Sequence, residues 1–242
     1  MNAIEIRNLT KKYGDRTVVD QLCLSIEQGE LFGLLGVNGA GKTTIIKMLT
    51  TLIQPTEGTA VLGGFDLKKD REQIRRITNV SPQETAVAPK LTVEENLLFM
   101  AKVYGADKRT AMTKTGDMIE KFDLSEITRQ KAGTLSGGWQ RRLSIAMALI
   151  SDPEILFLDE PTLGLDVLAR RELWQVISKL KGKVTVILTT HYLEEAEALA
   201  DHIAIMAKGK LKAVGTAKEL MQQAKTDQFE EAFIRIAEEN KV

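Results

Sequence analysis

The chain has 242 residues, of which 43% are hydrophobic and 27% charged, and this composition indicates a globular protein with a sizeable core. Lysine plus arginine equal aspartate plus glutamate at 33 each, so no overall positive field concentrates nucleic acid, and we expect no nucleic-acid partner. No stretch approaches the roughly 18 apolar residues of a membrane span, and the N-terminus lacks the pattern of a signal peptide. Any membrane-spanning part is therefore expected on another polypeptide.

The N-terminal residues and a later glycine-flanked segment read as strands. Apolar residues alternate with polar ones around Ile4 and Ile6 and again from Val18 to Ile26, and residues 58–64 read as a strand with its turn. These pieces favour an antiparallel β layer. The single cysteine, Cys23, cannot close an intramolecular disulfide, which fits a reducing cytoplasm, and we expect it to fill space in or beside a strand.

A phosphate-binding loop follows the apolar stretch 31–35. Its pattern is a glycine, four residues and then Gly-Lys-Thr, and an apolar spacing typical of a helix continues from Thr43 to Leu52. Glycines let backbone N–H groups turn inward on an anion, and the helix N-terminus adds the positive end of its dipole. Lys42 is expected to bridge the outer phosphates, and the Thr43 hydroxyl to ligate Mg²⁺. The predicted phosphate-binding residues are Gly36, Val37, Asn38, Gly39, Ala40, Gly41, Lys42, Thr43 and Thr44.

The middle of the chain, from about residue 90 to residue 150, has a helical period. Thr92 opens a T-x-x-E capping box, which predicts the start of a helix. Before this region, the basic stretch 68–76 reads as a solvated helix face. Ser136, Gly137 and Gly138 precede another helical stretch, which predicts a second helix N-terminus able to bind an anion.

Two continuous apolar runs, 155–158 and 184–188, read as buried parallel strands separated by a helix over about 169–180. Asp159 and Glu160 follow the first run, and His191 follows the second. In an open parallel sheet, ligands bind beyond the carboxyl ends of the strands, so these side chains should converge on the phosphate-binding loop. The alternative for Asp159 and Glu160, taken alone, is an acidic turn after a core strand. The alternative for His191, taken alone, is a neutral histidine on a loop.

Together these motifs resemble the ATPase subunit of ATP-binding cassette (ABC) transporters, over nearly the whole chain. The family's signature is the most specific of the motifs, because other phosphate-loop ATPases lack it. A finer resemblance to drug-resistance-type exporters lies in residues 91–97, 161–166 and 204–216. The matching positions are Tyr13 for the aromatic that stacks on adenine, Ser81-Pro82-Gln83 for the glutamine loop, 135–141 for the signature, 155–160 for the Walker B strand, Gly164-Leu165-Asp166 for the aspartate loop and His191 for the switch histidine.

The resemblance implies an α/β fold: a P-loop NTPase core with a mostly parallel sheet, an antiparallel β subdomain and a helical subdomain. Residues 1–84 and 151–215 would form the core with its antiparallel layer, residues 85–150 the helical signature subdomain, and residues 216–242 a short helical tail.

The resemblance also assigns chemistry to individual side chains. Asp159 would hold Mg²⁺ through water, with Thr43 and Gln83 as further metal contacts, and Glu160 would act as the general base. His191 would contact the γ-phosphate, so that Glu160, His191 and Lys42 form the catalytic set. Tyr13 would stack on adenine, or alternatively serve only in packing. Gln83 would contact the metal, or alternatively be a solvated loop side chain.

Resemblance further implies that two subunits pack head to tail around two ATP molecules, each held by the phosphate-binding loop of one chain and the signature of the other. Trp139 reads as a packing residue, with a subunit or membrane-partner contact as the alternative. Asp166 belongs to the aspartate loop. The signature residues expected at the opposite subunit's ATP are Leu135, Ser136, Gly137, Gly138 and Trp139.

The leading hypothesis is an ATP-hydrolysing subunit that powers export through a separate transmembrane permease subunit. It would use ATP and Mg²⁺, pair with a second identical or different ATPase subunit, and lie at the cytoplasmic face of a membrane through its partner. One alternative is a soluble ABC ATPase that does not transport. Another is a non-catalytic nucleotide sensor, which would typically have lost Glu160 or His191.

Overall fold

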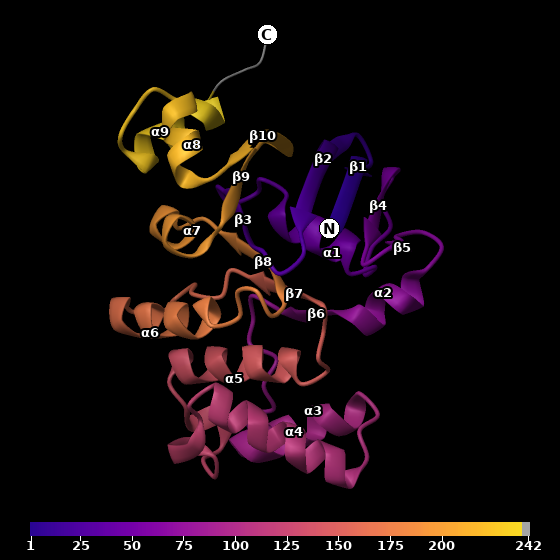
Figure 1. Ribbon diagram of the computed structural model, residues 1–242, viewed down its shortest axis with the longest axis vertical. Helices are drawn as coiled ribbons and strands as arrows, with labels where there is room; N and C mark the ends of the chain where they lie inside the picture. The colour runs from indigo at the N-terminus through magenta and orange to yellow at the C-terminus, as the bar shows by residue number, and fades with distance from the viewer. Residues whose placement is uncertain (239–242) are drawn as a thin grey trace.

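The computed structural model describes residues 1–238 and contains two sheets and a group of helices (Figure 1). The first sheet is antiparallel, with strand order β2-β1-β4-β5, and it confirms the strands expected near the N-terminus. Cys23 lies on β2, but it is exposed, so the expectation that it fills space is wrong. The alternation of the strand turns Leu22 and Ile26 inward and Cys23 outward. The strands are β1 (Asn2–Tyr13), β2 (Arg16–Glu27), β4 (Glu57–Leu62) and β5 (Phe65–Asp66).

The second sheet has the order β10-β9-β3-β8-β7-β6, and every neighbouring pair except β10 with β9 is parallel. Strands β3, β7 and β8 are buried along their whole length, which is why their sequences are continuous apolar runs. The strands are β3 (Leu31–Gly36), β6 (Thr78–Ser81), β7 (Ile155–Asp159), β8 (Thr185–Thr190), β9 (His202–Ala207) and β10 (Lys210–Gly215).

Helix α1 (Lys42–Leu49) contributes to a core shared with both sheets, where Phe32 and Phe157 are buried. The helix is shorter than the sequence predicts. The Thr50 hydroxyl donates to the carbonyl of Ile46 at 2.7 Å and Thr51 takes a φ of 61°, so the chain turns away before Leu52, whose side chain is 68% exposed. A further helix, α2 (Arg71–Ile77), carries the second half of the basic stretch 68–76, and Lys68 and Lys69 precede it. Both lysines are exposed, as are Arg75 and Arg76 on the helix.

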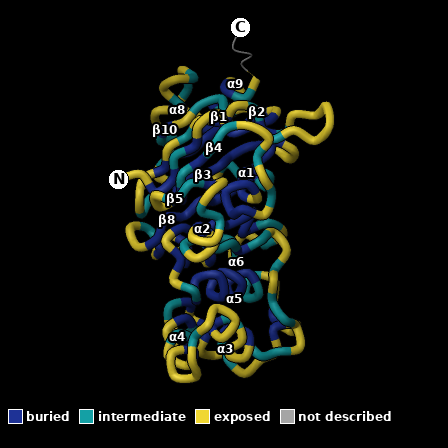
Figure 2. Tube along the Cα trace, turned by 90° about the vertical axis from the view of Figure 1, so that its right-hand side faces the viewer, coloured by how far each residue is buried: buried dark blue, intermediate teal, exposed yellow. Residues whose placement is uncertain are grey.

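A helical subdomain packs against the sheet at the end opposite the antiparallel layer (Figure 1). The capping box at Thr92 is present, with the Thr92 hydroxyl accepting from Glu95 N and the Glu95 carboxylate accepting from Thr92 N. Figure 2 shows α5 as a buried helix between the rest of the subdomain and the sheet. The helices are α3 (Val93–Val103), α4 (Lys108–Lys121) and α5 (Gly137–Leu149), with 3-10 turns at Ser125–Ile127 and Ala132–Thr134.

Four more helices complete the described part of the chain. Helix α6 (Val167–Ser178) follows β7, and α7 (Leu193–Leu199) follows β8. Helices α8 (Ala217–Gln223) and α9 (Phe229–Glu238) lie in the predicted tail 216–242, of which residues 239–242 lie outside the described residues. Within residues 1–238, no helix combines the length and the apolar character that crossing a bilayer requires.

Candidate functional site

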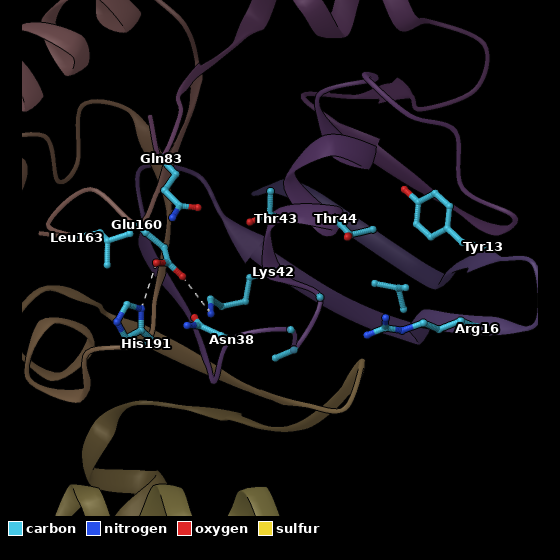
Figure 3. Close-up of a pocket in the computed structure, with 14 residues that line it drawn as sticks. Tyr13, Arg16, Asn38, Lys42, Thr43, Thr44, Gln83, Glu160, Leu163 and His191 are labelled. Atoms are coloured by element: carbon cyan, nitrogen blue, oxygen red, sulfur yellow. Dashed lines mark ion pairs between the residues drawn. The ribbon is translucent and has the colours of Figure 1, made fainter. Parts of the chain in front are cut away.

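The phosphate-binding loop joins β3 to α1, as the sequence predicts. Gly41 caps the helix with a φ of 101°, a conformation open to glycine because it has no Cβ, and Lys42 is the first helical residue. The helix N-terminus opens into a pocket of about 520 Å³ (Figure 3). Residues 38–44 line this pocket, and Gly36 and Val37 lie just before them at the end of the strand.

The ammonium group of Lys42 lies inside the loop, and the residue is 5% exposed. Its Nζ atom donates to the carbonyl oxygens of Gly36 at 2.6 Å and Val37 at 3.3 Å, and lies 3.4 Å from Oε1 of Glu160. Burial lowers the pKa of Lys42 below its ordinary value of 10.5, and the carboxylates of Glu160 and Asp159 oppose that shift. A buried cation held mainly by carbonyl oxygens is suited to receive an anion.

The two adjacent carboxylates at the end of β7 diverge. Oδ1 of Asp159 accepts hydrogen bonds from the hydroxyl of Thr189 at 2.6 Å and from the hydroxyl of Thr43 at 3.3 Å. The Glu160 side chain instead lies between Lys42 and a histidine (Figure 3). The two carboxylates can therefore act on different parts of one ligand.

Glu160 has a left-handed backbone with a φ of 48°. For a residue with a Cβ this conformation costs about 1–2 kcal/mol, and such residues gather at functional sites. The Glu160 N–H group points at Thr189: the Glu160 nitrogen lies 3.1 Å from both the carbonyl oxygen and the hydroxyl oxygen of Thr189. The end of β8 therefore holds the turn that aims the Glu160 side chain into the pocket.

His191 reaches the same carboxylate from the end of β8. Its Nδ1 atom lies 3.1 Å from Oε2 of Glu160, without the alignment of a hydrogen bond, and its side chain is 25% exposed. The predicted catalytic set of Glu160, His191 and Lys42 is thus brought together from three separate segments (Figure 3).

The oxygen groups at the loop suit a magnesium ion that arrives with a nucleotide. Among residues 1–238, no group of three or more His, Cys, Asp or Glu side chains is arranged to hold a metal ion. The Thr43 hydroxyl and the Asp159 carboxylate meet at the loop, and Gln83 lines the pocket. Mg²⁺ usually keeps several waters and takes one or two protein oxygens together with phosphate oxygens, so this donor set fits it.

The loop that carries Gln83 is anchored by a residue to which the sequence analysis gave no role. Arg141 lies on α5, is 4% exposed, and donates to the carbonyl oxygens of Pro82 at 2.6 Å and of Gln83. Its position within the signature motif is the signal that could have marked it. This contact ties helix α5 to the loop that carries Gln83.

Tyr13 lines the pocket at the end opposite Glu160 and His191 (Figure 3). Its side chain is 52% exposed, so it is no core residue, and the Nζ atom of Lys11 lies 5.0 Å from the ring centroid. The neighbouring Arg16 also lines the pocket and was not expected there.

The signature residues do not line this pocket. Ser136 is the N-cap of α5, makes no side-chain cap and is exposed together with Gly137, whereas Leu135 is buried. Trp139 packs against the core of the helical subdomain, with the Arg142 guanidinium 4.5 Å from its ring centroid. The N-terminus of α1 therefore opens into the pocket, whereas that of α5 lies outside it.

Asp166, expected in the aspartate loop, is the N-cap of α6. Its Oδ1 atom accepts hydrogen bonds from Leu168 N at 2.9 Å and Ala169 N at 3.0 Å. The following Val167 and Leu168 are 62% and 74% exposed, so the first turn of α6 presents apolar side chains to the surroundings.

The sequence profile of the ABC transporter family matches residues 19–163, which include the phosphate-binding loop, the signature and Glu160. The chain belongs to this family. A solved structure described as the ATP-binding subunit of an ABC transporter is 28% identical, with a TM-score of 0.84 over 97% of this chain and 99% of that one. These findings confirm the family and the α/β P-loop NTPase fold predicted from the sequence.

Several relatives of the chain are named for drug transport or resistance. It is 42% identical over 239 residues to the probable multidrug ABC transporter ATP-binding protein YbhF of Escherichia coli (strain K12), covering 96% of this chain but 41% of that protein. It is 38% identical over 225 residues to the doxorubicin resistance ATP-binding protein DrrA of Mycobacterium tuberculosis (strain ATCC 25618 / H37Rv), covering 92% of this chain and 68% of that protein. The chain thus spans less than half the length of the first relative.

Proposed function

We propose that this chain binds MgATP in the pocket of the phosphate-binding loop and hydrolyses its terminal phosphoanhydride bond. The observation that carries the proposal is the convergence of Lys42, Glu160 and His191 in one pocket, with Glu160 held between the other two. Lys42 exchanges its carbonyl contacts for the outer phosphates, Glu160 takes a proton from the attacking water, and His191 contacts the γ-phosphate.

The remaining pocket residues position the substrate. Backbone N–H groups at the N-terminus of α1 face the phosphates, and the Tyr13 ring stacks on adenine, which contributes on the order of 1–3 kcal/mol. Thr43, Asp159 and Gln83 hold the magnesium ion of the substrate, in part through water.

We further propose that two chains pair head to tail around two nucleotides. The support is the exposed N-terminus of α5, which lies outside the nucleotide pocket of its own chain and is open to a second copy. ATP then bridges the phosphate-binding loop of one chain and the signature of the other, and hydrolysis lets the copies part. The aspartate loop, with its exposed apolar residues next to Asp166, lies at the same contact.

The work that hydrolysis drives is export through a separate transmembrane subunit, which holds this chain at the cytoplasmic face of a membrane. The names of two relatives support this: one is a probable multidrug ABC transporter ATP-binding protein, and the other is a doxorubicin resistance ATP-binding protein. Extraction in mild detergent from the native cell, followed by identification of the co-purifying proteins, tests it. Recovery without any multi-span membrane protein would favour a soluble ABC ATPase.

The substitution Glu160→Gln tests the catalytic assignment. We expect the variant to bind MgATP with wild-type affinity and to hydrolyse it at least about 10²-fold more slowly, because an amide cannot accept the proton. Glu154→Gln is the matched control: Glu154 lies just before the other end of β7 and is exposed, so its rate should stay at the wild-type level. Unchanged turnover in Glu160→Gln would remove Glu160 from the role of base. If the wild-type chain binds ATP but does not hydrolyse it, either alone or with its partner, the result would favour the alternative of a non-catalytic nucleotide sensor.

A further inference from the structure

Buried side-chain atoms without a hydrogen-bond partner gather in one region of the fold. Residues 1–238 contain five such atoms, and four of them lie in the segments that follow β7 and β8. These four are Oγ1 of Thr162, Nε of Arg170, Nδ1 of His191 and Oε2 of Glu195, and the fifth is Oγ1 of Thr115 in the distant helix α4. Because each unsatisfied buried group costs free energy, such a cluster needs a physical explanation.

Glu195 lies at the centre of this cluster. It is 0% exposed in the first turn of α7, and its Oε1 atom accepts a hydrogen bond from Trp174 Nε1 on α6 at 3.1 Å. The hydroxyls of Thr190 and Thr162 also face the carboxyl group. Burial raises the pKa of Glu195 above its ordinary value, and these hydroxyls, Trp174 and the Arg170 guanidinium oppose the rise. The proposed hydrolysis makes no direct use of this buried acid.

The two threonines whose hydroxyls face the Glu195 carboxyl group belong to the two segments that carry catalytic side chains. Thr162 comes two residues after Glu160, and Thr190 directly precedes His191. Both threonines are essentially inaccessible to solvent, at 0% and 1% exposure. The 3.1 Å approach of His191 to Glu160 therefore depends on how far apart these two segments are held. Catalytic groups need placement to within roughly half an ångström.

We propose that Glu195 is a positioning residue for ATP hydrolysis, whose carboxyl group, bonded to Trp174 and facing Thr162 and Thr190, sets the spacing between Glu160 and His191. This inference rests on the proposed function of the chain. Glu195 does not line the nucleotide pocket, so its effect falls on kcat and leaves the KM for ATP unchanged.

Three substitutions and one control test the role in turnover. Glu195→Leu removes the polar contacts and should lower kcat at least about ten-fold with KM within about two-fold, since small misplacement of catalytic groups is costly. Glu195→Gln keeps one acceptor and one donor and should restore kcat to within about three-fold of wild type. Thr162→Val should also lower kcat. Thr115→Val removes the one comparable unpartnered hydroxyl far from the site and should leave kcat unchanged.

A second measurement does not depend on turnover. The chain has two histidines, so ring ¹H–¹⁵N spectra of the nucleotide-free protein report on His191 with His202 as an internal reference. In Glu195→Leu we expect the His191 signals to shift while those of His202 stay in place. If the signals of both histidines shift and the melting temperature falls, Glu195→Leu is generally misfolded. The kcat and the His191 signals of Thr162→Val then decide whether Glu195 has the positioning role.

The outcomes separate this inference from the proposed function. Wild-type kcat in Glu195→Leu with unmoved His191 signals would overturn the positioning role. An equal loss in Glu195→Gln and Glu195→Leu would overturn the role of its hydrogen bonds. A wild-type chain without ATPase activity would refute the proposed function, while the His191 spectra would still support or overturn the role of Glu195.

Discussion

The phosphate-binding loop offers a pair of glycines whose replacement by alanine should have different costs. Gly39 and Gly41 both have positive φ, 81° and 101°, so a Cβ at either position adds a backbone cost of about 1–2 kcal/mol. At Gly39 the added Cβ would have no neighbour within 4 Å. At Gly41 it would lie 2.7 Å from the carbonyl oxygen of Val18 and 3.2 Å from a methyl of Val19, and β2 holds that backbone in place.

Overpacking of this kind typically adds about 1–3 kcal/mol. We therefore expect Gly39→Ala to lower the free energy of unfolding by about 1–2 kcal/mol and Gly41→Ala by about 2–5 kcal/mol. Urea unfolding of the nucleotide-free protein, followed by circular dichroism at equal protein concentration, measures both. Equal destabilisation in the two variants would refute the inferred contact between the loop and β2.

Three further predictions concern other parts of the fold. In the Glu160→Gln background, Ser136→Arg should abolish ATP-driven dimerisation while leaving nucleotide binding to the monomer intact, and unchanged dimers in light scattering would contradict the shared site. Thr92→Ala should cost about 0.5–2 kcal/mol of stability in urea unfolding, while Thr92→Ser, which keeps the hydroxyl, should cost less. Burial raises the pKa of Glu195 above 4.5, so its carboxyl group stays protonated to higher pH in the folded chain than in the unfolded chain. The wild type therefore loses stability as pH rises above about 4.5. The stability of Glu195→Gln relative to wild type should therefore grow as pH rises above about 4.5, by at most about 1.4 kcal/mol per pH unit, and a difference that stays constant from about pH 4 upward would refute this.

The convergence of the site was predictable because parallel strands end at one edge. Residues after the apolar runs 155–158 and 184–188 had to meet at that edge once both runs were read as buried parallel strands. The glycines, Lys42 and Thr43 followed from the chemistry of phosphate binding, which requires those residue types at fixed spacing. Local patterns were enough here because the site lies where regular elements end.

Other features depend on contacts that no local pattern encodes. The end of α1 is set by the conformation of Thr51, which the apolar spacing through Leu52 does not reveal. Arg141 reads as one more basic residue on a helix, and its two carbonyl partners lie 58 and 59 residues away along the chain. Glu195 reads as a solvated acid beside Glu194, because only the packing of α7 on α6 and β8 buries it.

Features that cost stability gather at the edge where the parallel strands β3, β7 and β8 end. They are the left-handed backbone of Glu160, the buried ammonium of Lys42 and the unpartnered atoms around Glu195. In the nucleotide-free chain Glu160 contacts both Lys42 and His191, so the base is engaged by two groups that the proposed mechanism assigns to phosphate. We expect a bound triphosphate to draw Lys42 and His191 toward itself and to free Glu160 for water. Binding would then stabilise the fold and free the base together, because Lys42 and His191 would leave the Glu160 carboxylate for phosphate in one rearrangement.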